Sequence, residues 1–205
     1  MNLLLIRHAE PDTEDGPRPD PPLSLRGRGQ ASALARWLTA DRLAAVYTSP
    51  LRRAGETASY LSAAPTPVAG LAEVGGAGEY VAAEVMRRNG DPRWPALLAG
   101  DLAAFGTDVA TFRAAVVDAI EGIVAHHPGD TVAVVSHAAV INAYLGAQLG
   151  IRDRLIWSTL DYASVTRVIA SRQGVRTLAA LNERAHHCGQ PAEPLKESPP
   201  CPVGS

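Results

Sequence analysis

The sequence predicts an α/β protein built as a three-layer α/β/α sandwich, with a mostly parallel central sheet and a small cap insertion. Two short apolar runs, at residues 1–6 and 131–136, have the composition of strands buried on both faces of a sheet. Stretches with helical spacing of apolar residues lie between such runs, and 108–126 is the clearest of them. Strands that alternate with helices favour a parallel sheet covered on both sides, and such sheets bind ligands at the carboxyl ends of their strands.

The first third of the chain predicts two strands and two helices. After the strand at 1–6, a loop rich in Pro and Asp spans 11–22, and residues 25–38 then place apolar residues at helical spacing. Residues 44–48 predict a second strand. The Ser-Pro pair that follows predicts the start of a helix running toward Leu61, because serine caps helices and proline suits the first turn.

The middle of the chain has the least regular pattern. Residues 65–71 predict a loop with a short strand at Val68, and a glycine-rich segment follows. The cap-like insertion covers about 74–108. Within it we expect a helix near 82–88 and a loop around Trp94 that projects over a site.

The last third predicts a helix, a strand pair and a tail. Residues 131–136 are the strongest candidate for a central strand, and a helix is predicted directly after them at 138–149. Residues 162–170 and 175–181 predict two paired strands. The Pro-rich residues 188–205 are expected to be disordered. We therefore expect one domain over 1–187, with the cap as its insertion.

Charge and cysteine content exclude several classes of protein. The net charge is −2 and no cluster of Lys or Arg stands out, so we expect neither nucleic acid nor a membrane surface as a partner. The first apolar run is short and lacks a preceding basic region, which argues against a signal peptide or membrane span and favours a cytoplasmic protein. Cys188 and Cys201 lack the spacing of metal ligands and are interpreted as free thiols.

Two histidines stand directly after predicted buried strands. His8 follows the strand at 1–6, and His137 follows the strand at 131–136. If these strands are parallel neighbours, both side chains lie on the same rim of the sheet. Either histidine alone is more often an ordinary residue at a strand end than a catalyst.

Arginines near these histidines indicate an anion pocket. Arg7 precedes His8, and Arg52 and Arg53 lie inside the helix that the Ser-Pro pair starts. Guanidinium groups stay charged and bind phosphate oxygens in a bidentate way. Taken singly, each arginine could equally be a solvated surface charge.

Four segments together resemble one family. They are LLLIRHAEP, LSLRGRGQASALARWL, TSPLRRAGETASYL and VAVVSHAAVINAYL. In this order they are similar to the motifs of the histidine phosphatase superfamily, the phosphoglycerate-mutase-like group. The segment LAEVGGAGEY stands where the mutase relatives have a different acid segment, which favours the phosphatase branch. The resemblance spans about residues 3–186. Four motifs in the family's order are far more specific than a lone RHAE.

The resemblance implies a role for each matching residue. His8 matches the nucleophile that becomes a phosphohistidine, and Arg7 matches a phosphate-binding arginine. In SPLRRA the family's arginine directly precedes the alanine, which favours Arg53 over Arg52. His137 matches the second histidine of the phosphate pocket. His8 itself also contacts the bound phosphate in this scheme.

The general acid follows from the resemblance less directly. The family's glutamate corresponds to Glu73, and Glu79 is the alternative. The chain departs from the commoner family pattern at Ala9, Pro11 and Ala138. The family's substrate contacts in the entrance loop, residues 11–22, are therefore not transferred to this sequence.

The resemblance implies a metal-independent phosphoric monoester hydrolase that needs no cofactor and acts on a small phosphorylated metabolite. A phosphotransferase of the mutase type is the alternative within the enzyme class. A non-catalytic protein that binds a phosphorylated ligand on the same fold is the alternative from another class. A metal site at the adjacent pairs His126-His127 or His186-His187 is disfavoured, because no carboxylate or cysteine supports them. The sequence leaves the substrate and the oligomeric state open.

Overall fold

A six-stranded sheet forms the centre of the computed structural model, which describes residues 1–13, 16, 18–76, 78–81 and 83–187. The strand order is β4-β3-β6-β1-β7-β8. The strands are β1 (Asn2–Arg7), β3 (Ala45–Thr48), β4 (Thr66–Pro67), β6 (Thr131–Ser136), β7 (Val165–Ala170) and β8 (Arg176–Glu183). The first four in spatial order run parallel, whereas β7 and β8 are antiparallel to their neighbours. The predicted α/β fold with a mostly parallel sheet is confirmed.

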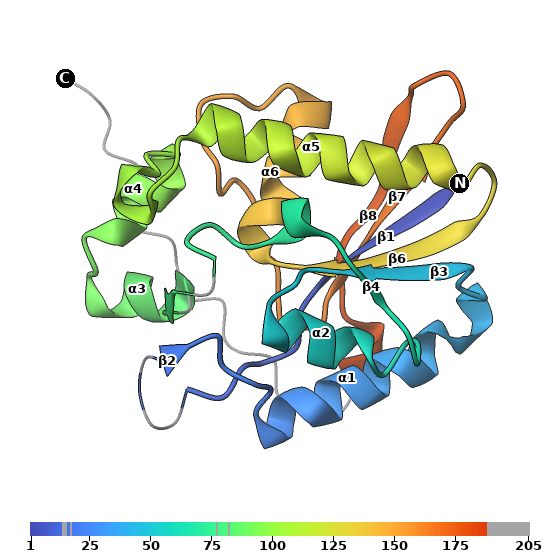
Figure 1. Cartoon of the computed structure of the whole chain (residues 1–205), viewed down its shortest axis with the longest axis horizontal. Coiled ribbons are helices and arrows are strands. Elements are labelled where there is room, and N and C mark those ends of the chain that lie inside the picture. Colours follow the sequence, from blue (N-terminus) through green and yellow to red (C-terminus); the bar gives the residue numbers. More distant parts are fainter. Residues whose placement is uncertain (14–15, 17, 77, 82, 188–205) are drawn as a thin grey trace.

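Helices cover both faces of the sheet (Figure 1). They are α1 (Leu25–Trp37), α2 (Arg52–Ala58), α3 (Ala83–Asn89), α4 (Arg93–Ala99), α5 (Val109–His126) and α6 (Ala138–Leu149). Short 3₁₀ helices lie at η1 (Leu38–Asp41), η2 (Ala69–Leu71), η3 (Ala103–Phe105) and η4 (Ala185–His187). In Figure 1, α1 and α2 lie on one side of the sheet and α5 and α6 on the other.

The core has two halves, separated by the sheet. Along β1, Leu3 and Leu5 belong to the apolar cluster that also contains the buried residues of α5 and α6. Leu4 and Ile6 belong to the cluster under α1 and α2. Successive side chains of a strand point to opposite faces. A continuous apolar run is therefore what a strand needs when helices cover both of its faces, as the sequence predicted.

The helix after β3 begins later than expected. Ser49 is not its cap, because α2 begins at Arg52 and its N-cap position is Leu51, which has an extended backbone. The carboxylate of Asp20, from the entrance loop, accepts the Arg52 N–H at 2.9 Å instead. The Ser49 hydroxyl has a different partner, in the site described below.

Two further local predictions were wrong. The segment around Trp94 is not a loop but the helix α4, which tolerates Pro95 because it lies in the first turn, where a backbone N–H has no helical partner. The short strand near Val68 occupies Thr66–Pro67 instead. The expected helix near 82–88 is present as α3.

The segment between residues 74 and 108 contains α3, α4 and η3, and it contacts the entrance loop. Its strand β5 (Glu79–Tyr80) pairs with β2 (Arg18–Pro19) in a separate two-stranded sheet. The division of the chain into one domain with a cap insertion stays a prediction. The tail at 188–205, with Cys188 and Cys201, lies outside the described residues. Over the described part of the chain, no helix is both long enough and apolar enough to span a bilayer.

Gly70 lets the segment leading to Glu73 approach α5 closely. A Cβ atom at Gly70 would lie 2.7 Å from the carbonyl oxygen of Ala115 and 2.7 Å from the Cβ of Ala119, both in α5. We expect Gly70→Ala to lower the free energy of unfolding by about 1–3 kcal/mol, because backbone must move to make room. Urea denaturation measures this loss.

A second glycine provides the matched control. Gly122 lies within α5, and a Cβ atom there would meet open space. Gly122→Ala should raise stability by about 0.5–1 kcal/mol, because alanine loses less backbone entropy in a helix. Equal effects of the two substitutions would show that the close approach at Gly70 is unimportant.

Candidate active site

The two predicted strand-end histidines lie side by side. β1 and β6 are parallel neighbours, and their register pairs Arg7 with Ser136. His8 and His137 are the next residue of each strand, so both emerge at the carboxyl rim of the sheet. Their ring centroids are 5.1 Å apart. The structure therefore brings together the two histidines that the sequence could place only conditionally.

The ring of His8 is held in one orientation by the backbone of the next residue, Ala9. Its Nδ1 lies 2.7 Å from the carbonyl oxygen of Ala9, and its backbone N–H donates to the carbonyl of Ser136 at 2.8 Å. A carbonyl oxygen only accepts, so the ring proton is on Nδ1. Nε2 then carries the lone pair, and it accepts from Nε of Arg53 at 3.3 Å. This is the tautomer in which Nε2 is free to act as a nucleophile.

The surroundings of His8 keep its ring neutral. Burial lowers the pKa of His8 well below its usual value, and the positive charges of Arg53 and Arg7 lower it further. The hydrogen bond to Ala9 acts in the opposite direction but is weaker. A neutral imidazole is the nucleophilic form.

Arg53, not Arg52, belongs to the site. The Arg53 side chain is 1% exposed, contacts His8 and lies 3.5 Å from Asp20. The Arg52 side chain is 59% exposed and forms an ion pair with Glu56 on the outside of α2. The structure thus places Arg53 in the site and Arg52 on the surface, as the position of Arg53 directly before the alanine of the motif had favoured.

Arg7 and Arg53 lie on aromatic rings that the sequence analysis missed. The guanidinium carbon of Arg7 is 3.9 Å from the centroid of Tyr162, and that of Arg53 is 4.4 Å from the centroid of Tyr80. The two tyrosine hydroxyls are 3.3 Å apart. Cation–π contact holds each guanidinium in place without neutralising it. Tyr80 lies in β5 and Tyr162 lies in the turn before β7, and neither belongs to a motif, so no sequence signal pointed to a role in the site.

Arg7 has a further anchor at the base of the site. It is 3% exposed and donates a short hydrogen bond to the carbonyl oxygen of Leu160. Both guanidinium groups are therefore buried and oriented before any ligand binds.

His137 is buried beside these groups and contacts a serine. Its Nε2 lies 2.8 Å from the hydroxyl oxygen of Ser49. Burial lowers the pKa of His137 well below its usual value, and the charges of Arg53, His8 and Arg7 act in the same direction. The ring is therefore neutral at ordinary pH.

Glu73 lies at the wall of the same cavity. Burial raises its pKa above the usual value, against the opposing effects of Arg53, the Val74 N–H and Arg7. A carboxyl group with a raised pKa retains its proton at higher pH, which suits a general acid. The side chain of Glu79, the alternative acid, falls outside the part that the structure describes.

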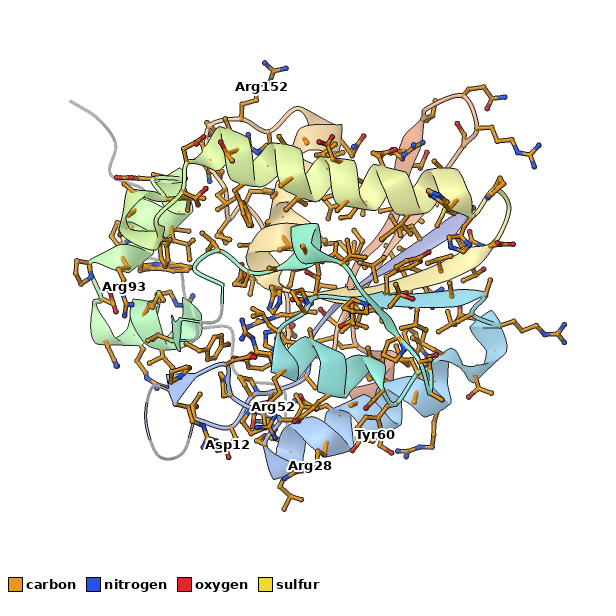
Figure 2. All side chains as sticks on the ribbon, in the orientation of Figure 1. Asp12, Arg28, Arg52, Tyr60, Arg93 and Arg152 are labelled. Atoms are coloured by element: carbon orange, nitrogen blue, oxygen red, sulfur yellow. The ribbon has the colours of Figure 1, made fainter. Side chains whose placement is uncertain are left out.

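The cavity has a volume of about 290 Å³, which suits a small molecule. Arg7, His8, Arg53 and Glu73 are among its polar lining residues. Apolar lining comes from the segment between residues 74 and 108, with Met86, Leu97 and Phe105 among its members. Arg93, which pairs with Asp91 at 2.6 Å, adds one cation at the start of α4 (Figure 2).

Two further histidines contact residues outside this cavity. His127 lies between the Tyr47 hydroxyl, at 2.9 Å, and the Asp130 carboxylate, at 3.3 Å. His186 stacks on Trp37. Within the described ranges, no three or more His, Cys, Asp or Glu side chains gather in a way that could hold a metal ion.

Comparison with known proteins agrees with this geometry. A sequence model of the histidine phosphatase superfamily, branch 1, matches residues 3–184. The chain is 30% identical to phosphoserine phosphatase 1 of Hydrogenobacter thermophilus, over 91% of this chain and 94% of that protein.

Solved structures share the fold over nearly the whole described chain. One is a phosphoserine phosphatase from Entamoeba histolytica in complex with 3-phosphoglyceric acid, with a TM-score of 0.73 and 25% identity over 90% of this chain and 98% of that one. Another is a mycobacterial glucosyl-3-phosphoglycerate phosphatase, with a TM-score of 0.73 and 24% identity over 89% and 99% of the two chains. The resemblance in the sequence motifs is confirmed. The chain therefore belongs to branch 1 of the histidine phosphatase superfamily and is a phosphoric monoester hydrolase.

Proposed function

We propose that the protein hydrolyses a small phosphomonoester without a metal ion, through a phosphohistidine formed on Nε2 of His8. The observation that carries this proposal is the orientation of the His8 ring. Nδ1 is occupied by the Ala9 carbonyl, and Nε2 faces Arg53 in a cavity that Arg7 also lines. His137 lies beside His8, with the two ring centroids 5.1 Å apart. A protein that only binds phosphate has no need of an oriented imidazole lone pair at the centre of its cations.

In the first half-reaction, the phosphoryl group moves from the substrate to His8. Arg7, Arg53 and His137 hold the phosphoryl oxygens, and Nε2 attacks the phosphorus atom. The bond between phosphorus and the leaving oxygen breaks, and Glu73 donates its proton to that oxygen. Fixed positive charge around the transferring group stabilises the transition state.

In the second half-reaction, water replaces the histidine. Glu73, now a carboxylate, takes a proton from the water as its oxygen attacks phosphorus. The bond between phosphorus and Nε2 breaks, inorganic phosphate leaves, and His8 returns to its neutral form. Glu73 regains the proton that it gave up, so one residue serves both steps.

The substrate belongs to the class of small phosphorylated metabolites. The relatives are named for phosphoserine and glucosyl-3-phosphoglycerate, and one binds 3-phosphoglyceric acid. A cavity of about 290 Å³ beside the cations has room for a ligand of this kind. The proposal includes a cytoplasmic location. A panel of phosphorylated metabolites, with phosphate release as the readout, identifies the preferred compound.

Turnover distinguishes a phosphatase from a binding protein. We expect the purified protein to release inorganic phosphate from para-nitrophenyl phosphate, and His8→Ala to reduce kcat by about 10⁴-fold or more, because the nucleophile is lost. Binding of inorganic phosphate without any turnover would support the non-catalytic alternative. Transfer to a second hydroxyl of a phosphoglycerate, with little phosphate released, would support a mutase.

Glu73→Gln tests the general acid. With alkyl phosphates, kcat/KM should fall by about 10²–10⁴-fold, whereas with para-nitrophenyl phosphate it should fall by less than about tenfold, because that leaving group needs no proton. kcat/KM is the appropriate quantity because it reports phosphorylation of His8 and not the later attack of water.

The same variant predicts a change in pH dependence. The pKa of Glu73 is raised, so its protonated form is present at low pH and is lost as pH rises through that pKa. With an alkyl phosphate, kcat/KM should therefore decline on the alkaline side, and this decline should be absent in Glu73→Gln. Equal losses for both leaving groups would remove Glu73 from the acid role.

The adjacent arginines form a matched pair of substitutions. Arg53→Lys should lower kcat/KM by about 10²–10³-fold, because lysine cannot reproduce the fork of donors that holds the phosphoryl oxygens. Arg52→Lys should change it by less than about twofold, because this side chain is solvated and its ion pair is exposed. The reverse order of effects would contradict the assignment.

A further inference from the structure

Ser49 contacts the active site from the end of β3 and has no role in the mechanism above. Its hydroxyl is buried, and the residue is 1% exposed. The hydroxyl oxygen accepts the N–H of Leu51 at 3.2 Å and lies 2.8 Å from Nε2 of His137. Two hydrogen bonds thus fix this side chain between the backbone of the next turn and a histidine of the site.

The direction of the bond between Ser49 and His137 follows from counting donors. The Leu51 N–H can only donate, so it does not satisfy the hydroxyl proton of Ser49. Among the described residues, the structure gives that proton one acceptor, which is Nε2 of His137. A buried hydroxyl group is rarely left without an acceptor. Ser49 therefore donates and Nε2 accepts.

This direction determines where the proton of His137 resides. A neutral imidazole whose Nε2 accepts must carry its hydrogen on Nδ1. The pKa of His137 is lowered by burial and by the charges of Arg53, His8 and Arg7, so the ring is neutral. The reverse arrangement, with hydrogen on Nε2, would leave the Ser49 proton without an acceptor.

Nδ1 of His137 is a buried donor that awaits an acceptor. The residue is 0% exposed, and in the described part of the chain this nitrogen has no hydrogen-bond partner. Leaving a buried donor unpaired costs free energy that a bound acceptor recovers. The His137 ring is 5.1 Å from that of His8, close to where a transferring phosphoryl group sits.

We infer that Ser49 is a positioning residue that locks His137 in the neutral tautomer with hydrogen on Nδ1, so that this N–H donates to a phosphoryl oxygen. The inference rests on the proposed phosphatase mechanism. It assigns His137 the role of an oriented neutral donor beside the two guanidinium groups, rather than that of a third cation.

The tautomer can be measured in the unmodified protein. Nitrogen-15 NMR of protein labelled at histidine distinguishes a protonated from an unprotonated ring nitrogen, and His137→Ala assigns the signals. We expect hydrogen on Nδ1 and a lone pair on Nε2 at neutral pH. Hydrogen on Nε2, or a doubly protonated ring, would overturn the inference. This result does not depend on whether any variant at Ser49 folds.

Ser49→Ala tests the functional consequence. We expect a loss of about 10–100-fold in kcat/KM and weaker inhibition by orthovanadate, because one donor to the phosphoryl group is no longer oriented. Thr166→Val is the matched control. It removes another buried hydroxyl, which accepts the Asn182 N–H at 3.3 Å in the sheet, and should leave kcat/KM unchanged. Thermal denaturation of both variants separates loss of fold from loss of positioning.

A double-mutant cycle shows whether Ser49 acts through His137. In a His137→Ala background, Ser49→Ala should reduce kcat/KM by less than about threefold. The same fractional loss in both backgrounds would overturn the inference. Activity that depends on His8 but is unchanged in Ser49→Ala would overturn it while leaving the proposed function intact, whereas full activity in His8→Ala would refute the proposed function itself.

Discussion

β1 and β6 pair in parallel over their whole length, and the register of this pair decides which side chains meet at the rim of the sheet. Each strand delivers one histidine immediately after its last residue. If either strand slipped by one residue, its histidine would move along the rim. Every side chain of that strand would also move to the opposite face of the sheet. Both halves of the core, which are packed against α1 and α2 on one side and α5 and α6 on the other, resist such a shift. The hydrophobic core therefore holds the geometry of the site.

The site that this frame supports is rich in buried positive charge. Arg7 and Arg53 are each at most 3% exposed, and burial of a guanidinium is costly unless its surroundings compensate. Tyrosine rings, the Leu160 carbonyl and the more distant Asp20 supply part of that compensation. In the proposed mechanism, the phosphate group of the substrate adds negative charge beside both guanidinium groups. The same two charges lower the pKa of His8 and His137, so in the proposed mechanism the cations both bind the substrate and keep the nucleophile neutral.

Prediction from the sequence succeeded where a pattern reports a local physical requirement. The apolar runs gave the strands of the core, and the arginine adjacent to Ala54 in the motif is the one that contacts His8. Prediction failed where a local structure depends on contacts with residues that are distant in the chain. The Asp20 carboxylate, which is distant in sequence, accepts the first N–H of α2, and the Ser49 hydroxyl contacts His137 as well as the N–H of Leu51.

Tyr80 and Tyr162 illustrate the same limit within the site. They contact the arginines only because β5 and the turn before β7, which are far apart in the chain, meet beside His8, and neither tyrosine belongs to a motif. The raised pKa of Glu73 likewise depends on burial that the sequence does not encode locally. Residues presented by strand ends could be predicted, whereas residues brought in by loop packing could not.

The central claim is that Nε2 of His8 is the atom that accepts the phosphoryl group. The most direct measurement is phosphorus NMR of the phosphoenzyme, formed in Glu73→Gln to slow its breakdown and quenched in alkali, where phosphohistidine survives. The orientation of the ring, with Nδ1 held by the Ala9 carbonyl, predicts phosphorus bonded to Nε2 of His8. Phosphorus on Nδ1, or on any other residue, would contradict it.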